Sequence, residues 1–228
     1  MTRKNTEHIA SAERWQQLCA DLGLADAERE HALLLSAWSS RGRHYHTLQH
    51  LAACLLEFDA ARGLAQRAAE VELALWFHDA VYRTFRKDNE SRSADWAVQF
   101  LLEHGGAPEA IPRVRELVLA TVHASAELAG DAALVVDIDL SILGQRPAVY
   151  DEFERNVRKE YWWVPRRRYV AARRAILQSF LDRPSIYHWP YFRERYETAA
   201  RVNLAGALGT LQGDSRPNVG SGPRRPSS

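Results

Sequence analysis

The sequence predicts an all-α protein that folds as a single compact helical bundle. Apolar residues recur at helical spacing along almost the whole chain, whereas no stretch of β-branched residues alternates over five or six positions between turn residues. The chain has 228 residues, of which 46% are hydrophobic, and this is enough material for one sizeable core.

Each expected helix is a segment of apolar periodicity between turn signals. In chain order the expected helices are Ser11–Leu22, Ala27–Ser39, Thr47–Arg62, Ala65–Asp79, Asn89–Glu103, Glu109–Ala124, Ala132–Leu143, Pro147–Lys159, Pro165–Leu181 and Trp189–Leu211. Asn89 suits an N-cap, and Pro147, Pro165 and Pro190 suit the first turn of a helix. The expected stops are glycines just after the periodicity ends: Gly63, Gly105, Gly106, Gly130 and Gly144.

The chain divides into one helical domain, residues 1–212, and a tail, residues 213–228. No internal repeat of 20–50 residues is visible, which argues against a solenoid of stacked helix pairs. The tail consists mainly of Gly, Pro, Ser and Arg, with only Val219 to bury. We therefore expect the tail to be disordered and dispensable for folding and catalysis.

Charge and hydropathy exclude several classes of protein. Lys and Arg number 30 against 29 Asp and Glu, and no basic stripe offers the footprint of a nucleic-acid-binding protein. The chain has no apolar run long enough for a membrane span and no apolar stretch near its start for a secretory signal, so we expect a cytoplasmic protein. Cys19 and Cys54 are expected to be reduced packing residues, and the oligomeric state stays open.

Four short polar segments interrupt the apolar pattern, and each allows a structural reading and a chemical one. They are His44–His50, Trp76–Asp79, Thr121–His123 and Val135–Leu140. A His-Asp pair such as His78-Asp79 arises easily by chance, and its helix could simply end there with His78 bonded to a carbonyl and Asp79 solvated. However, the segment Val71–Phe77 before His78-Asp79 is apolar except for Glu72 and would draw both towards the interior, where a charge needs a partner.

The other segments supply partners of the same chemical kind. His46 and His50 share a face if a helix begins near Thr47, although such a pair is often two satisfied, half-buried histidines. Asp137 and Asp139 are bracketed by apolar residues, so an acidic pair there calls for a cation. Two imidazoles and two carboxylates bring a charge of −2 and suit Mn, Fe, Co, Ni or Zn, or Mg with waters completing its coordination. Open positions on such an ion would bind a phosphate oxygen and activate a water, which predicts a hydrolase.

The order His50, His78-Asp79, Asp139 on a helical chain resembles the H…HD…D signature of the HD superfamily of metal-dependent phosphohydrolases. Tyr45 to His50 also resembles the YHxxxH element of the cyclic-nucleotide phosphodiesterases, which are relatives of that superfamily. This resemblance implies that His50 binds the metal while His46 protonates the leaving oxygen.

The segment Asp137–Leu140 is similar to the D-x-D-[RL]-L region of small bacterial HD proteins. That similarity implies that Asp139 is a metal ligand together with His50, His78 and Asp79. Asp137 would then lie next to the ligands without binding the metal itself. Asp79 would also orient the attacking water.

The resemblance covers roughly residues 14–211, and it implies hydrolysis of a phosphoester in a small phosphorylated molecule such as a nucleotide. The chain departs from the common pattern because no Gly-Lys follows His78-Asp79. The phosphate-binding residue is therefore open, with Arg83, Arg86 and Lys87 in the next loop as candidates.

Two other functions remain open at this point. His123 and Glu90 would be the extra ligands of a second metal, as an HD-fold di-iron oxygenase that cleaves a C–P or C–C bond requires. His123 also suits a hydrogen-bonded core residue, and one metal is the simpler expectation. The other rival is a nucleotide-binding sensor that keeps the fold without turnover.

Overall fold

The computed structural model describes residues 6, 8–25, 27–122 and 127–213. Its α-helices are α2 (Ala12–Asp21), α3 (Glu28–Trp38), α4 (Leu48–Ala61), α5 (Ala68–Phe77), α6 (Asn89–Glu103), α7 (Ala110–Ala120), α8 (Gly130–Asp139), α9 (Pro147–Glu160), α10 (Arg166–Leu181), α11 (Pro190–Phe192) and α12 (Thr198–Gly213). Short 3₁₀ segments, η1 (Arg62–Leu64) and η2 (Leu140–Gly144), and a π-helical turn, η3 (Arg193–Glu197), join some of them. The described residues contain no strand, so the predicted all-α bundle is confirmed.

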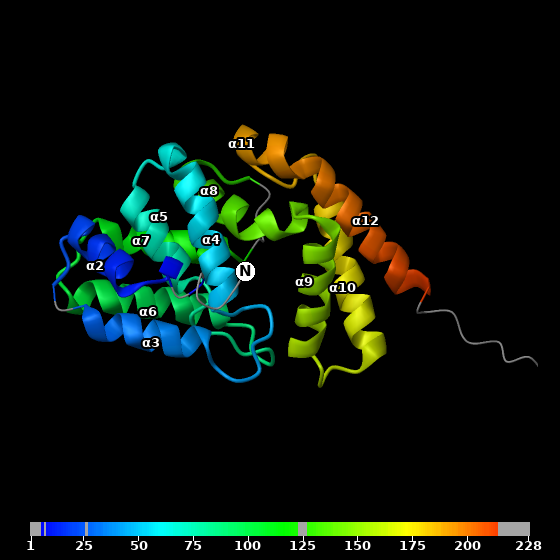
Figure 1. Ribbon diagram of the computed structural model, residues 1–228, viewed down its shortest axis with the longest axis horizontal. Coiled ribbons are helices and arrows are strands. Elements are labelled where there is room, and N and C mark those ends of the chain that lie inside the picture. Colours follow the sequence, from blue (N-terminus) through cyan, green and yellow to red (C-terminus); the bar gives the residue numbers. More distant parts are fainter. Residues whose placement is uncertain (1–5, 7, 26, 123–126, 214–228) are drawn as a thin grey trace, which may run out of the picture.

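Helix α5 lies at the centre of the fold and explains how the other helices are arranged. Every residue from Glu70 to Phe77 is buried, so this helix has no solvent-facing side. Helices α4, α6, α7 and α8 all pack against it, and α2 and α3 lie at the outer edge of this group (Figure 1). The buried apolar residues form one cluster that runs from Ala10 to Leu208.

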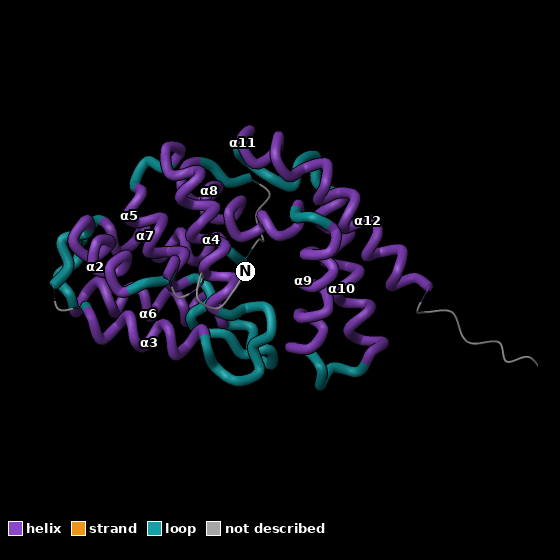
Figure 2. Tube along the Cα trace, in the orientation of Figure 1, coloured by secondary structure: helices purple, strands orange, loops and turns teal. Residues whose placement is uncertain are grey.

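Helices α9, α10 and α12 stand beside this group, joined to it through η2 (Figure 1). In the tube view, the loops between α3 and α4 and between α5 and α6 lie near the end of α9 that precedes the turn into α10 (Figure 2). Those loops carry His44–His46 and Asp79–Phe85. None of the helices in the described part of the chain is long and apolar enough to cross a membrane.

Most expected helices begin and end within four residues of those in the structure, and Gly130, expected as a stop, is instead the first residue of α8. Two further differences have a clear structural cause. Asn89 is the first residue of α6 and not its N-cap. Its side chain is used instead to hold the preceding loop: Oδ1 accepts from Arg83 N and Nδ2 donates to Arg83 O, both at 3.0 Å. The expected single helix Trp189–Leu211 is interrupted by η3, a π-helical turn. Its wider turn takes in one more residue than an α-helical turn and so shifts which residues share a face before and after it. Glu197, at the end of η3, accepts hydrogen bonds from the backbone amides of Ile186 and Tyr187, which fixes the turn against the preceding loop. The tail expected to be disordered lies outside the described residues beyond Gly213.

Gly144 is required by packing at the end of η2. A Cβ atom at this position would lie 2.4 Å from the Cβ of Tyr196 and 2.8 Å from its Cα. We expect Gly144→Ala to lower the free energy of unfolding by about 1–3 kcal/mol, the usual cost of overpacking. Urea denaturation measures this, with Gly209→Ala in α12 as the control, because nothing lies within 4 Å of a Cβ there. Equal stability of the two variants would contradict the close contact.

Candidate metal centre

Three side chains from distant parts of the sequence converge at one point of the bundle. His50 lies in the first turn of α4, His78 follows the last residue of α5, and Asp139 ends α8. His50 Nε2 is 3.1 Å from His78 Nε2 and 3.0 Å from Asp139 Oδ1, while His78 Nε2 is 3.7 Å from the same oxygen. Both histidines are buried, whereas Asp139 is partly exposed. The three donor atoms therefore face one another at the edge of the core.

The imidazole of His78 is oriented for ligation. Its Nδ1 lies 2.8 Å from the carbonyl oxygen of Leu75, which can only accept a hydrogen bond. The proton is therefore on Nδ1, and the lone pair of Nε2 is directed at the convergence point. Burial lowers the pKa of His50 despite its bond to Asp139, which favours the neutral form of the His50 ring.

Asp79 lies beside this trio. Its Oδ2 is 3.4 Å from His78 Nε2 and 3.9 Å from His50 Nε2. Arg43 positions the turn that carries Asp79, because its guanidinium donates to the carbonyl oxygens of Asp79 at 2.7 Å and Ala80 at 2.8 Å. All four residues that the resemblance implies as ligands are thus brought together.

Cys54 is a further member of the cluster that we had expected only to pack. It lies one helical turn after His50, with Sγ 3.7 Å from His50 Nε2. One potential donor atom from each of His50, Cys54, His78 and Asp139 falls within 4.8 Å of the others. Burial raises the pKa of the Cys54 thiol well above its usual value, so it is protonated and a poorer ligand than a carboxylate.

Glu160, at the end of α9, holds the loop before α4 in place, and the sequence analysis gave it no role. Its Oε1 accepts hydrogen bonds from the backbone amides of His44, Tyr45 and His46 at 2.7, 2.7 and 3.0 Å. Its Oε2 accepts from Tyr82 Oη at 3.0 Å and lies 2.7 Å from His46 Nδ1. Burial alone would raise the pKa of Glu160, but the hydrogen bonds and the charge of His46 lower it to about 2.

His46 comes before the helix and not on its face, because α4 begins at Leu48 with Thr47 as its N-cap. Its ring stacks on Tyr82 with centroids 4.0 Å apart, and its Nε2 lies 3.9 Å from Asp79 Oδ2. Burial lowers the pKa of His46, but Asp79 and Glu160 outweigh burial and raise it overall. His46 thus lies next to the cluster, in surroundings that favour its protonated form, without being a member of the cluster.

We expect Glu160→Gln to lower the unfolding free energy at neutral pH by about 3 kcal/mol, from 1.36 kcal/mol per pKa unit. The pKa of Glu160 falls from 4.5 to about 2 on folding, so its stabilisation is fully present above pH 4.5 and is lost as the pH falls through about 2. Urea titrations at pH 7 and pH 3 should therefore show the difference between variant and wild type shrinking. Asp151→Asn, an exposed change on the same helix, is the control, and a difference equal at both pH values would contradict the assignment.

Asp137, unlike Asp139, has a structural role away from the cluster. It is fully buried, and its two oxygens accept hydrogen bonds from the backbone amides of His188 and Trp189, at 2.7–2.9 Å. His188 Nδ1 also lies 2.8 Å from Asp137 Oδ1. The Asp137 carboxylate therefore ties α8 to the loop before α11.

The residues expected to bind phosphate or a second metal are not part of this cluster, or they lie outside the described residues. Arg83 lines a separate hollow of about 420 Å³, together with Tyr82, Glu160, Trp162 and Trp163. Arg86 pairs with Asp88 at 2.7 Å. Lys87 is exposed, and Glu90 is half-buried near the start of α6. His123 lies outside the described residues, and the only cluster of three or more close metal-ligating side chains in the described part is the one above.

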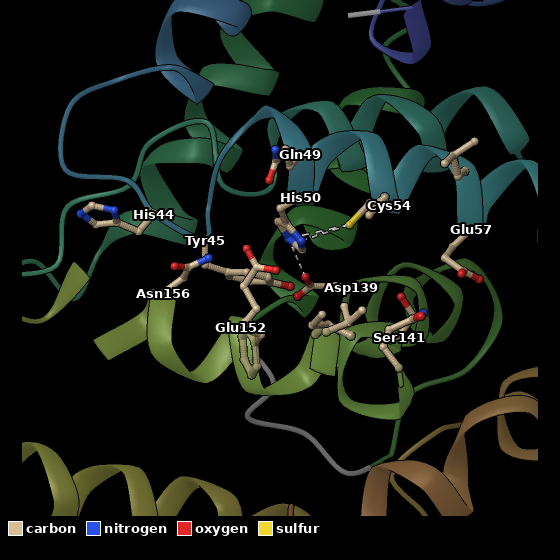
Figure 3. A pocket seen from close by; sticks show the side chains of 16 residues that line it. His44, Tyr45, Gln49, His50, Cys54, Glu57, Asp139, Ser141, Glu152 and Asn156 are labelled. Carbon is tan, nitrogen blue, oxygen red and sulfur yellow. Dashed lines mark hydrogen bonds and ion pairs between the residues drawn. The ribbon is translucent and has the colours of Figure 1, made fainter. Parts of the chain in front are cut away.

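A pocket opens beside the cluster between α4, α9 and η2, with a volume of about 340 Å³ (Figure 3). His50 and Asp139 lie at its wall and are joined by a hydrogen bond. Two ligand candidates are thus accessible to a small molecule, which a catalytic ion requires and a purely structural one does not.

Comparison of the chain with protein-family models, with curated proteins and with solved structures gives no match.

Proposed function

We propose that this protein is a metal-dependent phosphohydrolase of the HD type that cleaves a phosphoester of a small phosphorylated molecule. The observation that carries the proposal is the convergence of His50, His78 and Asp139, with Asp79 beside them, next to an open pocket. The resemblance to the HD superfamily rests on the same four residues and on their order along the chain.

The donor set fits a divalent ion. Two neutral imidazoles and two carboxylates give mixed nitrogen and oxygen ligation with a total charge of −2, which suits Mn, Fe, Co, Ni or Zn, or Mg with added waters. The hydrogen bond from His78 Nδ1 to Leu75 O is the kind of support that fixes a ligating imidazole. When bound, such an ion supplies Lewis-acid stabilisation of phosphoryl oxygens and a water of lowered pKa.

The residues around these ligands have distinct tasks in the proposed reaction. Asp79 Oδ2 lies within 3.9 Å of ring nitrogens of His46, His50 and His78, so this carboxylate can hold and orient a water for attack. His46 donates a proton to the departing oxygen, and the carboxylates of Asp79 and Glu160 favour the protonated ring by raising its pKa. Glu160 orients the His46 ring through Nδ1 and leaves Nε2 for the substrate side.

The proposal also includes the cellular compartment of the protein. Cys19 and Cys54 are both buried and unpaired, as in a reducing compartment. We therefore propose a cytoplasmic enzyme with a small phosphorylated molecule as its partner.

The proposal is tested by measuring phosphate release from a panel of sugar, amino-alcohol and nucleotide phosphates. The protein is stripped with a chelator and then given Mn²⁺, Fe²⁺, Co²⁺, Ni²⁺, Zn²⁺ or Mg²⁺ one at a time. We expect turnover with at least one ion and none after stripping, and we expect the double variant His50→Ala/His78→Ala to be inactive while His31→Ala stays active. Ligand binding without turnover across the panel would indicate a sensor, and release that ignores the metal would exclude the proposal.

A further inference from the structure

The pocket beside the metal centre carries an unusual charge for a site that takes phosphorylated molecules. Glu57 from α4 and Glu152 from α9 line it in addition to Asp139 (Figure 3), and no Lys or Arg is among its lining residues. A chain of several phosphates normally needs cationic side chains to offset its charge. Any anionic group beyond the one at the metal would therefore be repelled here.

Glu57 also leaves a hydrogen-bond acceptor without a donor from the protein. Its Oε1 accepts from Tyr196 Oη at 2.7 Å, whereas its buried Oε2 has no hydrogen-bond partner. Arg195 is close enough for its charge to interact with Glu57, but it does not line the pocket. Leaving a buried carboxylate oxygen unpaired is costly, so a ligand that brings a positive charge or a donor to this part of the pocket is favoured.

Aromatic rings complete the lining on the α9 side. Tyr45 and Phe153 pack edge to face with centroids 4.5 Å apart, and both line the pocket. Arg173 lies 5.2 Å from the centroid of Phe153, but its guanidinium is held by a two-pronged pair with Glu154. Aromatic rings combined with carboxylates form an environment that favours an ammonium group.

We propose that the substrates of this site are small phosphate monoesters whose other end carries a positively charged ammonium group. This inference rests on the proposed function, because it assumes that the phosphate lies at the metal. The ammonium group then lies against the part of the wall that these carboxylates and aromatic rings form, and the pocket volume of about 340 Å³, near the lower end for ligand sites, suits a molecule of that size.

A matched pair of probes tests this charge preference. Phosphocholine and 3,3-dimethylbutyl phosphate have the same shape, but the second has a neutral carbon in place of the nitrogen. We expect kcat/KM to be about 10-fold or more higher for phosphocholine, within the range of a desolvated cation–π contact. Glu152→Gln and Glu57→Gln should reduce this ratio, whereas Asp151→Asn, outside the pocket, should leave it unchanged.

A binding measurement makes the test independent of turnover. Calorimetry on the chelator-stripped protein should show choline binding more tightly than 3,3-dimethylbutan-1-ol, and the difference should fall in Glu152→Gln. Equal binding of the two alcohols, or a preference for 3-phosphoglycerate in turnover, would overturn the inference while leaving the phosphohydrolase intact. Absence of turnover on every phosphate, with the choline preference retained, would instead exclude the proposed function and leave a pocket that binds an ammonium group.

Discussion

Replacing Asp139 by asparagine is expected to abolish the thermal stabilisation that we expect divalent ions to give to the wild-type protein. Asp139 Oδ1 is the only carboxylate oxygen within 3.0 Å of His50 Nε2 in the described structure, so its loss removes a charged ligand from the centre. An ion at 100 times its Kd stabilises the folded state by about 2.7 kcal/mol, and the variant should lose most of this. Differential scanning calorimetry with and without the ion measures the loss.

Asp137→Asn is the matched control, two residues earlier on the same helix. Its carboxylate accepts hydrogen bonds from His188 and Trp189, so the amide leaves one or more donors unpaired. We expect this variant to melt lower in the absence of metal and still to gain stability when the ion is added. An Asp139→Asn protein that responds to the ion like wild type, or an Asp137→Asn protein that does not respond, would show that the two roles are assigned wrongly.

His46→Gln is expected to lower turnover by about 10²–10⁴-fold, the usual loss for a general acid, while the protein keeps its metal. Glutamine can still donate a hydrogen bond to Glu160, so the turn before α4 is preserved, but it has no proton to give to a leaving group. Elemental analysis checks the metal, and steady-state kinetics on an alkyl phosphate checks the rate.

The leaving group provides the internal control for this variant. A nitrophenolate leaves without being protonated, so nitrophenyl phosphate should lose much less rate in His46→Gln than an alkyl phosphate does. Equal losses on both substrates would remove the acid role from His46. Loss of metal from the variant would make His46 a ligand instead.

The fold was largely predictable because helical periodicity and local end signals agree along the chain. Helix α6 has the expected bounds of Asn89 to Glu103, and α9 begins at Pro147 as expected. The break at Arg193–Glu197 was not predictable, because its sequence keeps helical spacing. That turn is stabilised by Glu197 bonding to a loop ten residues earlier, which is a tertiary effect.

The candidate metal centre was predictable only in part, for a similar reason. His50, His78 and Asp139 stand out because polar residues interrupt apolar helices, and Cys54 had a usable signal in its spacing of four from His50. Glu160 had none, because its contacts are with residues 78 to 116 positions away. The separation of Arg83 from the pocket beside the metal centre likewise depends on how the loops pack.

The most direct test of the metal centre is the metal content of purified protein after chelation and dialysis against one divalent ion, measured by elemental analysis on three proteins. The account predicts about one ion per chain in wild type, none in His50→Ala/His78→Ala, and the wild-type value in His31→Ala, whose imidazole is bonded to the carbonyl of Ala10 at 3.0 Å. A wild-type protein that binds no ion, or a double variant that still binds one, would contradict it.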